Sequence, residues 1–354
     1  MVHNDMEMGR KHFREKEGAV MTEITARERR DSLTGEPAVE LSGVENFSAE
    51  MIFECGQCFR FDKKMDGSYE GVAHGRLLRV EQPSDNCVIL HHATLSDYES
   101  VWKNFFSLDE DYSAIKADIC ERFGQYGNTI YEAVHCASGI RILRQDPWEA
   151  LCSFILSQNN NIPRIKKIIA TLCRDLGEPF SVCGVTYYAF PCAQAIASAG
   201  INGLSPCRMG FRARYLLDAA EKCQNGKIHL EALSSADAPS AEMALTSILG
   251  VGKKVAACTM LYGLHKTEAF PIDIWMRRVL DKYYPEGLDL TALGNYAGIA
   301  QQYLFYYERE RLWEQTKKSD ASNSFYGSTE NKVPILQSGP HAAKIHCFKK
   351  GESL

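Results

Sequence analysis

The chain has 354 residues, of which 45% are hydrophobic and 24% are charged, and its formal net charge is −5. These values are typical of a soluble globular protein long enough for two domains, and the negative charge argues against binding nucleic acid over the whole surface. No apolar run approaches the ~20 residues that span a bilayer, so we expect no membrane association. The charged N-terminus shows no apolar leader, which predicts an intracellular protein whose thirteen cysteines are free thiols.

The first part of the chain predicts an arm followed by a sheet. Residues 1–40 hold nine acidic residues and no periodic apolar face, which indicates a flexible charged arm. Within an N-terminal domain over 41–135, turn residues separate short β-branched and aromatic runs: MIFE, QCFRFD, SYEGVA, RLLRVE and NCVILHH. This pattern predicts an antiparallel sheet built from successive hairpins.

After Thr94 the apolar period becomes helical. The candidate helices are SDYESVWKNFF, DPWEALCSFILSQ, IPRIKKIIATLCRDLG, FRARYLLDAAEKC, SAEMALTSIL, KKVAACTMLYGL, DIWMRRVLDKYY and YAGIAQQYLFYYERERL. Pro147, Pro163 and the cap Ser240 mark helix starts. We predict an α+β protein in which the small antiparallel β-sheet domain precedes a mainly α-helical domain over 136–312 and a polar, disordered tail over 313–354.

The middle of the chain is basic. Between Arg141 and Tyr215 there are nine Lys or Arg residues and only four Asp or Glu residues. This balance suggests a local anionic partner, although a solvated helix face would have the same composition.

Residues 249–258 read LGVGKKVAAC and predict two helices joined by a glycine hairpin. Gly250 and Gly252, with Val251 between them, allow positive φ and close approach of another backbone. The free N–H groups at the start of the second helix suit a phosphate. An ordinary corner between two helices, capped by glycine, would give the same pattern.

The lysines of this stretch suggest chemistry. Lys254 lies in the first helical turn, where the positive end of the helix disfavours an ammonium and favours the free amine, a nucleophile. Cys258 is four residues on, on the same face, whereas Lys253 is expected to meet solvent or phosphate. Asp273 begins the next helix after Pro271; alone it indicates an N-cap, but with Lys254 it suggests a carboxylate that stabilises positive charge.

These motifs resemble those of the helix-hairpin-helix DNA glycosylases, and most closely the 8-oxoguanine DNA glycosylase family. Six stretches in family order carry the resemblance: GQCFRF (56–61), IRILRQDPWEALCSFILSQNNNIPRI (140–165), GFRARY (210–215), ILGVGKKVAAC (248–258), AFPIDIWM (269–276) and YAGIAQQYLF (296–305). The resemblance implies that the helical domain is the catalytic HhH-GPD domain and that the partner is double-stranded DNA containing 8-oxoguanine.

The resemblance also implies a bifunctional glycosylase and AP lyase that acts as a monomer without a cofactor. Lys254 would attack C1′ of the flipped nucleotide and form a Schiff base, which permits β-elimination of the 3′ phosphate. Asp273 would stabilise the oxocarbenium-like transition state. The alternatives are a related glycosylase for another damaged base and a non-catalytic DNA-binding module.

The resemblance assigns base recognition to six positions. The Gly56 carbonyl would accept the N7–H that distinguishes 8-oxoguanine from guanine, unless Gly56 is a simple turn glycine. Gln301 would read the Watson–Crick edge, and Phe305 and Cys258 would cover the two faces of the base; alone, Phe305 would be interpreted as a core aromatic. The set of substrate-binding residues is Gly56, Gln57, Phe59, Cys258, Gln301 and Phe305.

Other positions would hold the DNA. Asn159, Arg164 and Arg212 would bind the cytosine opposite the lesion, although phosphate contacts by the arginines and a helix cap by Asn159 are the alternatives. Phe211 would be the wedge that unstacks the duplex. The hairpin Gly250, Val251 and Gly252 and the indole of Trp275 would approach the DNA backbone.

The sequence departs from the family pattern at two positions and shows no metal-binding motif. Trp275 stands where many relatives have a phosphate-binding histidine, and Ala257 where many have an aspartate. We therefore expect a weaker or repositioned phosphate contact. Only Cys347 follows Cys258, which excludes the four-cysteine iron–sulfur cluster of some relatives, and Cys55-x-x-Cys58 lacks a second pair for zinc. We predict no metal.

Overall fold

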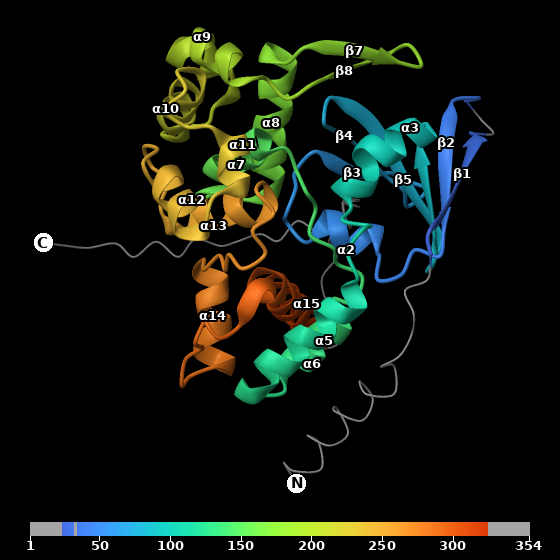
Figure 1. The fold of residues 1–354 in the computed structure, drawn as a ribbon, viewed down its shortest axis with the longest axis vertical. Coiled ribbons are helices and arrows are strands. Elements are labelled where there is room, and N and C mark those ends of the chain that lie inside the picture. Colours follow the sequence, from blue (N-terminus) through green and yellow to red (C-terminus); the bar gives the residue numbers. More distant parts are fainter. Residues whose placement is uncertain (1–22, 32–33, 325–354) are drawn as a thin grey trace, which may run out of the picture.

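The computed structural model describes residues 23–31 and 34–324, with side chains as far as Trp313 (Figure 1). A six-stranded antiparallel sheet of order β1-β2-β6-β5-β4-β3 forms one side of the molecule. Its strands are β1 (Thr25–Arg30), β2 (Pro37–Ser42), β3 (Phe61–Lys63), β4 (Tyr69–Ala73), β5 (Arg76–Ser84) and β6 (Cys87–His91).

Short helices cover one face of this sheet. They are α2 (Ala49–Glu54), α3 (Leu95–Asp97), a π-helical turn (Tyr98–Trp102) and α4 (Lys103–Phe105). Their aromatic side chains fill a core of their own: Trp102 is fully buried, and Phe53 stacks on Phe61 with ring centroids 4.3 Å apart. The strand residues that join this core are every second one, such as Val39 and Leu41, Leu78 and Val80, and Val88 and Leu90, so they share one face of the sheet.

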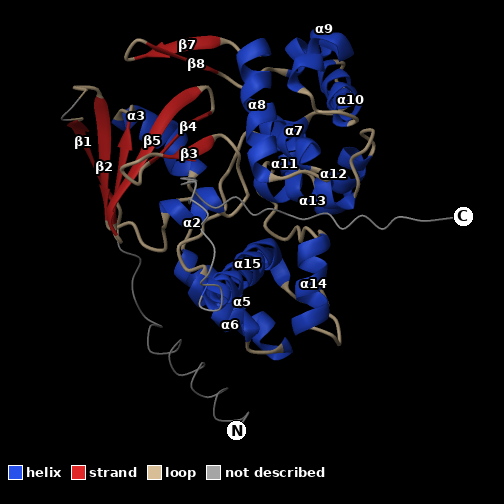
Figure 2. Cartoon of the chain, turned by 180° about the vertical axis from the view of Figure 1, so that it is seen from behind, coloured by secondary structure: helices blue, strands red, loops and turns tan. Residues whose placement is uncertain are grey.

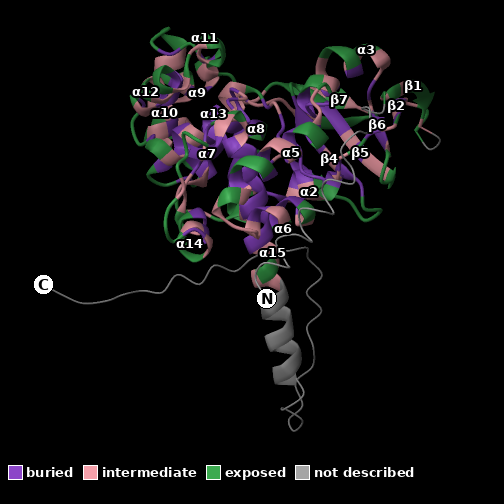
Figure 3. Cartoon of the chain, turned by 60° about the horizontal axis from the view of Figure 1, so that its bottom comes forward, coloured by how far each residue is buried: buried purple, intermediate pink, exposed green. Residues whose placement is uncertain are grey.

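The remaining helices form a second, larger core (Figure 2). They are α5 (Tyr112–Phe123), α6 (Thr129–Cys136), α7 (Pro147–Ser157), α8 (Ile162–Leu176), α9 (Ala193–Leu204), α10 (Arg212–Gln224), α11 (Leu230–Ser235), α12 (Ala238–Thr246), α13 (Lys253–Tyr262), α14 (Ile274–Tyr283) and α15 (Ala297–Ser324). A separate hairpin of β7 (Pro179–Val182) and β8 (Val185–Tyr188) follows α8. Figure 3 shows the buried residues, in purple, inside both parts of the molecule.

The structure corrects several predictions. Within the predicted arm over 1–40, residues 25–30 and 37–40 are not flexible, because they lie in β1 and β2, which pair over the whole length of β1; residues 1–22 and 32–33 lie outside the described part of the chain. The run MIFE lies in helix α2, where Ser48 is the N-cap. Helix α15 continues past residue 313 to Ser324, and the rest of the predicted tail lies outside the described residues. The N-cap of α12 is Asp237, which accepts a hydrogen bond from the Ser240 N–H.

Among the described residues, no helix is both long and apolar enough to cross a membrane.

Candidate active site and DNA-facing surface

Helix α10 packs against the glycine hairpin formed by residues 249–252. Gly250 has φ +75°, and a Cβ there would lie 2.3 Å from a ring carbon of Tyr215, so only glycine fits without displacing the ring. The Asp218 carboxylate accepts a hydrogen bond from the Leu249 N–H at 2.7 Å. Gly252 is the N-cap of α13, is exposed, and would meet nothing within 4 Å if it had a side chain. The free N–H groups of this helix start are therefore open to solvent, as an anion site requires.

Lys254 lies half-buried in the first turn of α13. Its Nζ donates a hydrogen bond to Ser157 Oγ at 3.3 Å and lies 5.5 Å from the ring centroid of Phe154. The structure records no ion pair for this ammonium among the described residues. Lys253 is exposed, as predicted. The amine of Lys254 is thus supported by an aromatic face and a hydroxyl but is not neutralised by a carboxylate.

Cys258 is hydrogen-bonded to Lys254 and lies within electrostatic range of Asp273. Its thiol is buried, and burial raises its pKa; the Lys254 ammonium lowers that pKa, and the Asp273 carboxylate raises it. Both charged groups therefore act on one thiol. Asp273 Oδ1 accepts a hydrogen bond from the Met276 N–H at 2.7 Å, so Asp273 is the N-cap of α14, the role that this residue alone indicated; its role as a catalytic carboxylate stays a prediction. The cap fixes the carboxylate beside the helix start while leaving Oδ2 without a recorded hydrogen bond.

Helix α15 contributes an unsatisfied polar atom. Gln301 is 5% exposed, and its Oε1 is buried without a hydrogen-bond partner. Phe305, one turn further along, is only partly buried. A buried acceptor without a donor costs about 1–3 kcal/mol, so this amide oxygen is suited to a donor that a ligand supplies.

The loop that carries Gly56 is fixed by buried hydrogen bonds. Gly56 has φ +85°, a conformation that strains any other residue. The fully buried Gln57 side chain donates from Nε2 to the carbonyls of Ile52 and Arg141, both at 3.0 Å, and accepts from the Leu143 N–H at 2.8 Å. Gln57 was predicted to bind the base, but these bonds use up its amide. It positions Gly56 instead.

Phe59 also differs from its prediction as a residue in contact with the base. It is buried, and its ring packs edge-on against Phe154 with centroids 5.9 Å apart. Because the Lys254 amine lies against the Phe154 ring, Phe59 supports the ring that contacts this amine. The GQCFRF stretch thus forms a wall of the site. Within the Gly56–Phe59 segment, Gly56 is the least buried residue.

The predicted contacts to the opposite base lie at one helix start. Asn159 and Arg164 are exposed, and Asn159 has φ +48°. The N-cap of α8 is Asn161, whose Oδ1 accepts from the Arg164 N–H at 3.0 Å. The alternative role of Asn159 as the helix cap is therefore wrong, and its side chain is free for another partner.

Arg212 was predicted to contact the opposite base directly, but its guanidinium is buried under the loop that carries Asn159. It donates to the carbonyls of Gln158 and Asn159, both at 2.7 Å, and of Met209 at 3.2 Å. Burial lowers the pKa of Arg212, and the charge of Arg164 adds to this effect. In this structure Arg212 holds the loop. To contact a base, its guanidinium would have to give up hydrogen bonds to these carbonyls.

Phe211 projects from the same edge. It is 49% exposed, and the Arg212 guanidinium lies 4.5 Å from its ring centroid. Tyr215 packs edge-on against it with centroids 5.6 Å apart. An exposed aromatic ring held on two sides has the form that a wedge between base pairs needs.

Sequence reasoning missed several exposed apolar residues beside these positions. Ile162, Leu249 and Ile274 are 41%, 52% and 73% exposed, and each is within two residues of a predicted DNA contact. Their location at hairpin tips and first helical turns, which the core cannot cover, is the signal that would have identified them.

Trp275 has a cationic neighbour that was also missed. The Arg278 guanidinium lies 5.1 Å from the Trp275 ring centroid, three residues further along α14. This spacing on a helix was visible in the sequence. The indole of Trp275 by itself offers only one N–H donor. Arg278 adds a positive charge beside it.

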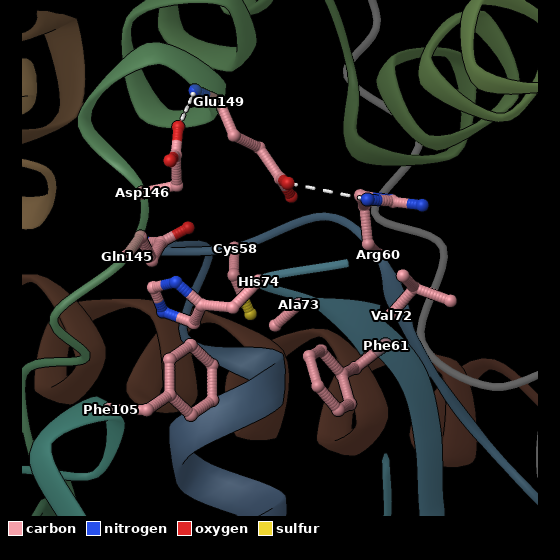
Figure 4. A pocket seen from close by; sticks show the side chains of 10 residues that line it. All are labelled: Cys58, Arg60, Phe61, Val72, Ala73, His74, Phe105, Gln145, Asp146 and Glu149. Carbon is pink, nitrogen blue, oxygen red and sulfur yellow. Dashed lines mark hydrogen bonds and ion pairs between the residues drawn. The ribbon is translucent and has the colours of Figure 1, made fainter. Parts of the chain in front are cut away.

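A cavity between the sheet and α7 is too small to be the base pocket. It encloses about 10 Å³, room for about one water molecule, and its walls include Arg60, His74, Asp146 and Glu149 (Figure 4). In the close-up the Glu149 carboxylate faces Arg60 at 3.3 Å. Burial raises the pKa of Glu149, and Arg60 opposes this rise. The cavity belongs to the packing between the two parts of the chain.

Comparisons with known proteins agree with this geometry. The N-terminal domain model of 8-oxoguanine DNA glycosylase matches residues 41–151, and the HhH-GPD superfamily base excision DNA repair model matches residues 152–287. An N-glycosylase/DNA lyase of Saccharomyces cerevisiae is 37% identical over 41% of this chain and 42% of its own length. The N-glycosylase/DNA lyase OGG1 of Arabidopsis thaliana is 29% identical over 72% of this chain and 75% of its own length.

A solved structure matches most of this chain. It is the Clostridium acetobutylicum 8-oxoguanine glycosylase/lyase in complex with double-stranded DNA containing cytosine opposite 8-oxoguanine. This chain is 34% identical to it, with a TM-score of 0.74, over 82% of this chain and 99% of that one. With a sheet domain and a helix-hairpin-helix domain matched in order and a lysine at the hairpin, the chain belongs to the 8-oxoguanine DNA glycosylase family of N-glycosylase/DNA lyases.

Proposed function

We propose that this chain excises 8-oxoguanine paired with cytosine from duplex DNA and then cleaves the strand, with Lys254 as the nucleophile. The observation that carries the proposal is the arrangement of Lys254 and Asp273 around the buried Cys258 thiol, at the start of a helix whose N–H groups are open to an anion. The Clostridium relative, bound to DNA with this lesion, supports the choice of substrate.

Extrusion of the damaged nucleotide exposes C1′ to the amine. Unstacking a base costs a few kcal/mol, which the Phe211 ring offsets by filling the space that the base leaves. Asn159 and Arg164 then bind the cytosine left without a partner, from the loop that Arg212 holds. Because these groups all lie on one chain, we propose that the enzyme acts as a monomer.

Recognition of the extruded base rests on two elements. Gln301 Oε1, buried and without a partner, accepts a hydrogen bond from the Watson–Crick edge. The Gly56 carbonyl accepts the N7–H of 8-oxoguanine; guanine has only a lone pair at N7 and is rejected. Phe305 and Cys258 cover the two faces of the ring.

The chemistry needs an amine, a carboxylate and a proton carrier. The free amine of Lys254 forms a bond to C1′ as the glycosidic bond breaks, and the electron pair of the broken bond leaves with the base. The departing base takes up the proton that the lysine nitrogen loses, and it therefore serves as the proton carrier. Asp273 stabilises the positive charge that develops on the sugar. The aminal opens to a Schiff base, loss of a C2′ proton expels the 3′ phosphate, and water releases the lysine.

Borohydride trapping tests this proposal. Wild type, Lys254→Gln and the neighbouring control Lys253→Gln are each incubated with a duplex containing 8-oxoguanine opposite cytosine. We expect a covalent adduct with wild type and Lys253→Gln and none with Lys254→Gln, which still binds the duplex. An adduct with an abasic duplex but not with 8-oxoguanine would refute the substrate and preserve the lysine chemistry. An adduct with Lys254→Gln would refute the nucleophile.

A further inference from the structure

The β7–β8 hairpin reaches from the helical part of the molecule over the N-terminal sheet (Figure 1). Its base is tied to the sheet domain by Arg60 Nη2, which donates to the Tyr188 carbonyl at 2.6 Å. Its tip is a two-residue turn, Cys183-Gly184, in which φ is +49° and +75°. Such turns favour glycine, asparagine and aspartate, so an exposed cysteine at the first position is unusual.

Two other ligand-type side chains lie at the end of the sheet beneath this tip. Glu36 immediately precedes β2 and His92 immediately follows β6, and these strands are neighbours whose ends are joined by the Ala93 N–H to Pro37 carbonyl hydrogen bond at 3.2 Å. A carboxylate oxygen of Glu36, a ring nitrogen of His92 and Cys183 Sγ all lie within 4.8 Å of one another. His92 Nδ1 is buried and has no hydrogen-bond partner.

We propose that Glu36, His92 and Cys183 bind a zinc ion that fastens the hairpin tip to the edge of the sheet. Thiolate, imidazole and carboxylate are the three side-chain ligand types that zinc takes in proteins, and a water molecule completes the tetrahedron. On binding, the Cys183 thiol releases its proton to solvent. The thiolate and the carboxylate then balance the two positive charges of the ion, so the complex is neutral.

The surroundings are compatible with this ion. A tetrahedral zinc site separates its ligand atoms by about 3.5 Å, so the group must contract slightly, which an exposed hairpin tip allows. Burial lowers the pKa of His92, which leaves its imidazole neutral and able to donate a lone pair. Partial desolvation and a hydrogen bond to Glu36 raise the pKa of the Cys183 thiol, an effect that a bound cation reverses.

The nearby Asp31 has other partners. It accepts hydrogen bonds from the Thr34 N–H at 2.8 Å and the Thr34 hydroxyl at 3.0 Å, and it lies 2.7 Å from His91 Nδ1. The three ligands come from positions 36, 92 and 183, so no paired-cysteine spacing reveals the site. The site lies outside the catalytic groups and is expected to stabilise the joint between the two parts of the molecule without taking part in base excision.

Metal binding by the untagged, full-length protein tests this proposal. After treatment with a chelator and dialysis, wild type, Cys183→Ser, His92→Asn and the control Cys192→Ser are titrated with Zn²⁺ against a chromophoric chelator. Asparagine tolerates the positive φ of residue 92, and Cys192 is another exposed cysteine outside the group. Titration with Co²⁺ then reports thiolate coordination by its near-ultraviolet charge-transfer band.

We expect wild type and Cys192→Ser to bind one Zn²⁺ per chain, to gain thermal stability with it, and to show the cobalt–thiolate band. Cys183→Ser and His92→Asn should bind Zn²⁺ at least about tenfold more weakly and lose that gain, with circular dichroism unchanged and excision by Cys183→Ser unaffected. Absence of stoichiometric binding by wild type, or equal binding by wild type and Cys183→Ser, would overturn the proposal.

Discussion

Among single residues, Gly56 is restricted by its backbone conformation and not by its neighbours. Its φ of +85° lies in the left-handed region, yet an added Cβ would meet only Ile162 Cδ1, at 4.0 Å. Crowding therefore does not require glycine here, whereas backbone conformation does. The Gln57 amide holds the peptide on its other side by three buried hydrogen bonds to backbone groups.

Gly56→Ala is expected to impair base recognition selectively. Alanine at this φ costs about 1–2 kcal/mol and moves the carbonyl that we propose accepts N7–H, so excision of 8-oxoguanine should slow about tenfold or more. Cleavage of a preformed abasic site does not need this carbonyl and should proceed at the wild-type rate. Single-turnover assays on the two duplexes measure both rates, and an equal loss on both would contradict the assigned role.

The sequence predicted residues whose partners are local better than residues whose partners are distant. The N-cap role of Asp273, which the sequence indicated for this residue taken alone, could be predicted because its partner is three residues away. Gln57 and Arg212 were assigned to base contacts, yet Gln57 bonds to a carbonyl 84 residues away and Arg212 to one 54 residues away. No spacing rule connects such positions. From the sequence alone, the same polar side chain is compatible with a contact to a ligand and with a buried structural hydrogen bond. Only its neighbours in the structure distinguish the two.

For single elements, the glycine hairpin offers a matched pair of substitutions. Gly250→Ala places a methyl group against the Tyr215 ring at a positive φ and should lower the free energy of unfolding by about 1–3 kcal/mol. Gly252→Ala meets open space at a negative φ and should change stability by under about 0.5 kcal/mol. Denaturant titrations of both variants give the difference, and equal stabilities would show that Tyr215 moves aside without cost.

Helices were predicted correctly where the apolar pattern of the sequence was long. Helix α8 has a clear apolar face, α7 and α13 are long apolar runs buried on most sides, and all three were predicted close to their observed bounds. Helix α2 was mistaken for a strand because its six residues are too few to show a helical period. The β1 strand was missed because it is mostly exposed and therefore lacks apolar alternation; its pairing with β2 supplies the order.

Across the whole molecule, an acidic residue joins the two parts of the chain. Glu110 Oε1 lies 2.9 Å from Arg144 Nη2 and 2.8 Å from His265 Nε2, and its side chain is 24% exposed. Burial opposes its ionisation, but His265 and Arg144 outweigh burial and hold the pKa of Glu110 below its usual 4.5. Between the folded and unfolded pKa values the unfolded chain binds more protons, so stability rises with pH there.

Glu110→Gln is therefore expected to lower the free energy of unfolding by about 1–3 kcal/mol at pH 7. The difference from wild type should persist down to about pH 4.5 and shrink as the pH falls further through the folded pKa of Glu110. Urea titrations at several pH values measure it. Glu99→Gln, at an exposed ion pair, is the control and should show little change at any pH. A difference that grows on acidification would contradict the assignment.

The hydrogen bond between Gln302 Nε2 and the Cys55 carbonyl has a consequence for how the protein is made. It spans 3.1 Å in space and 247 residues in sequence, and it joins α15 to the loop that presents Gly56. A chain still emerging from the ribosome can form the lysine hairpin before α15 exists, but not the wall that accepts a base. The active site is completed only when α15 is in place, so an unfinished chain cannot select and excise a base.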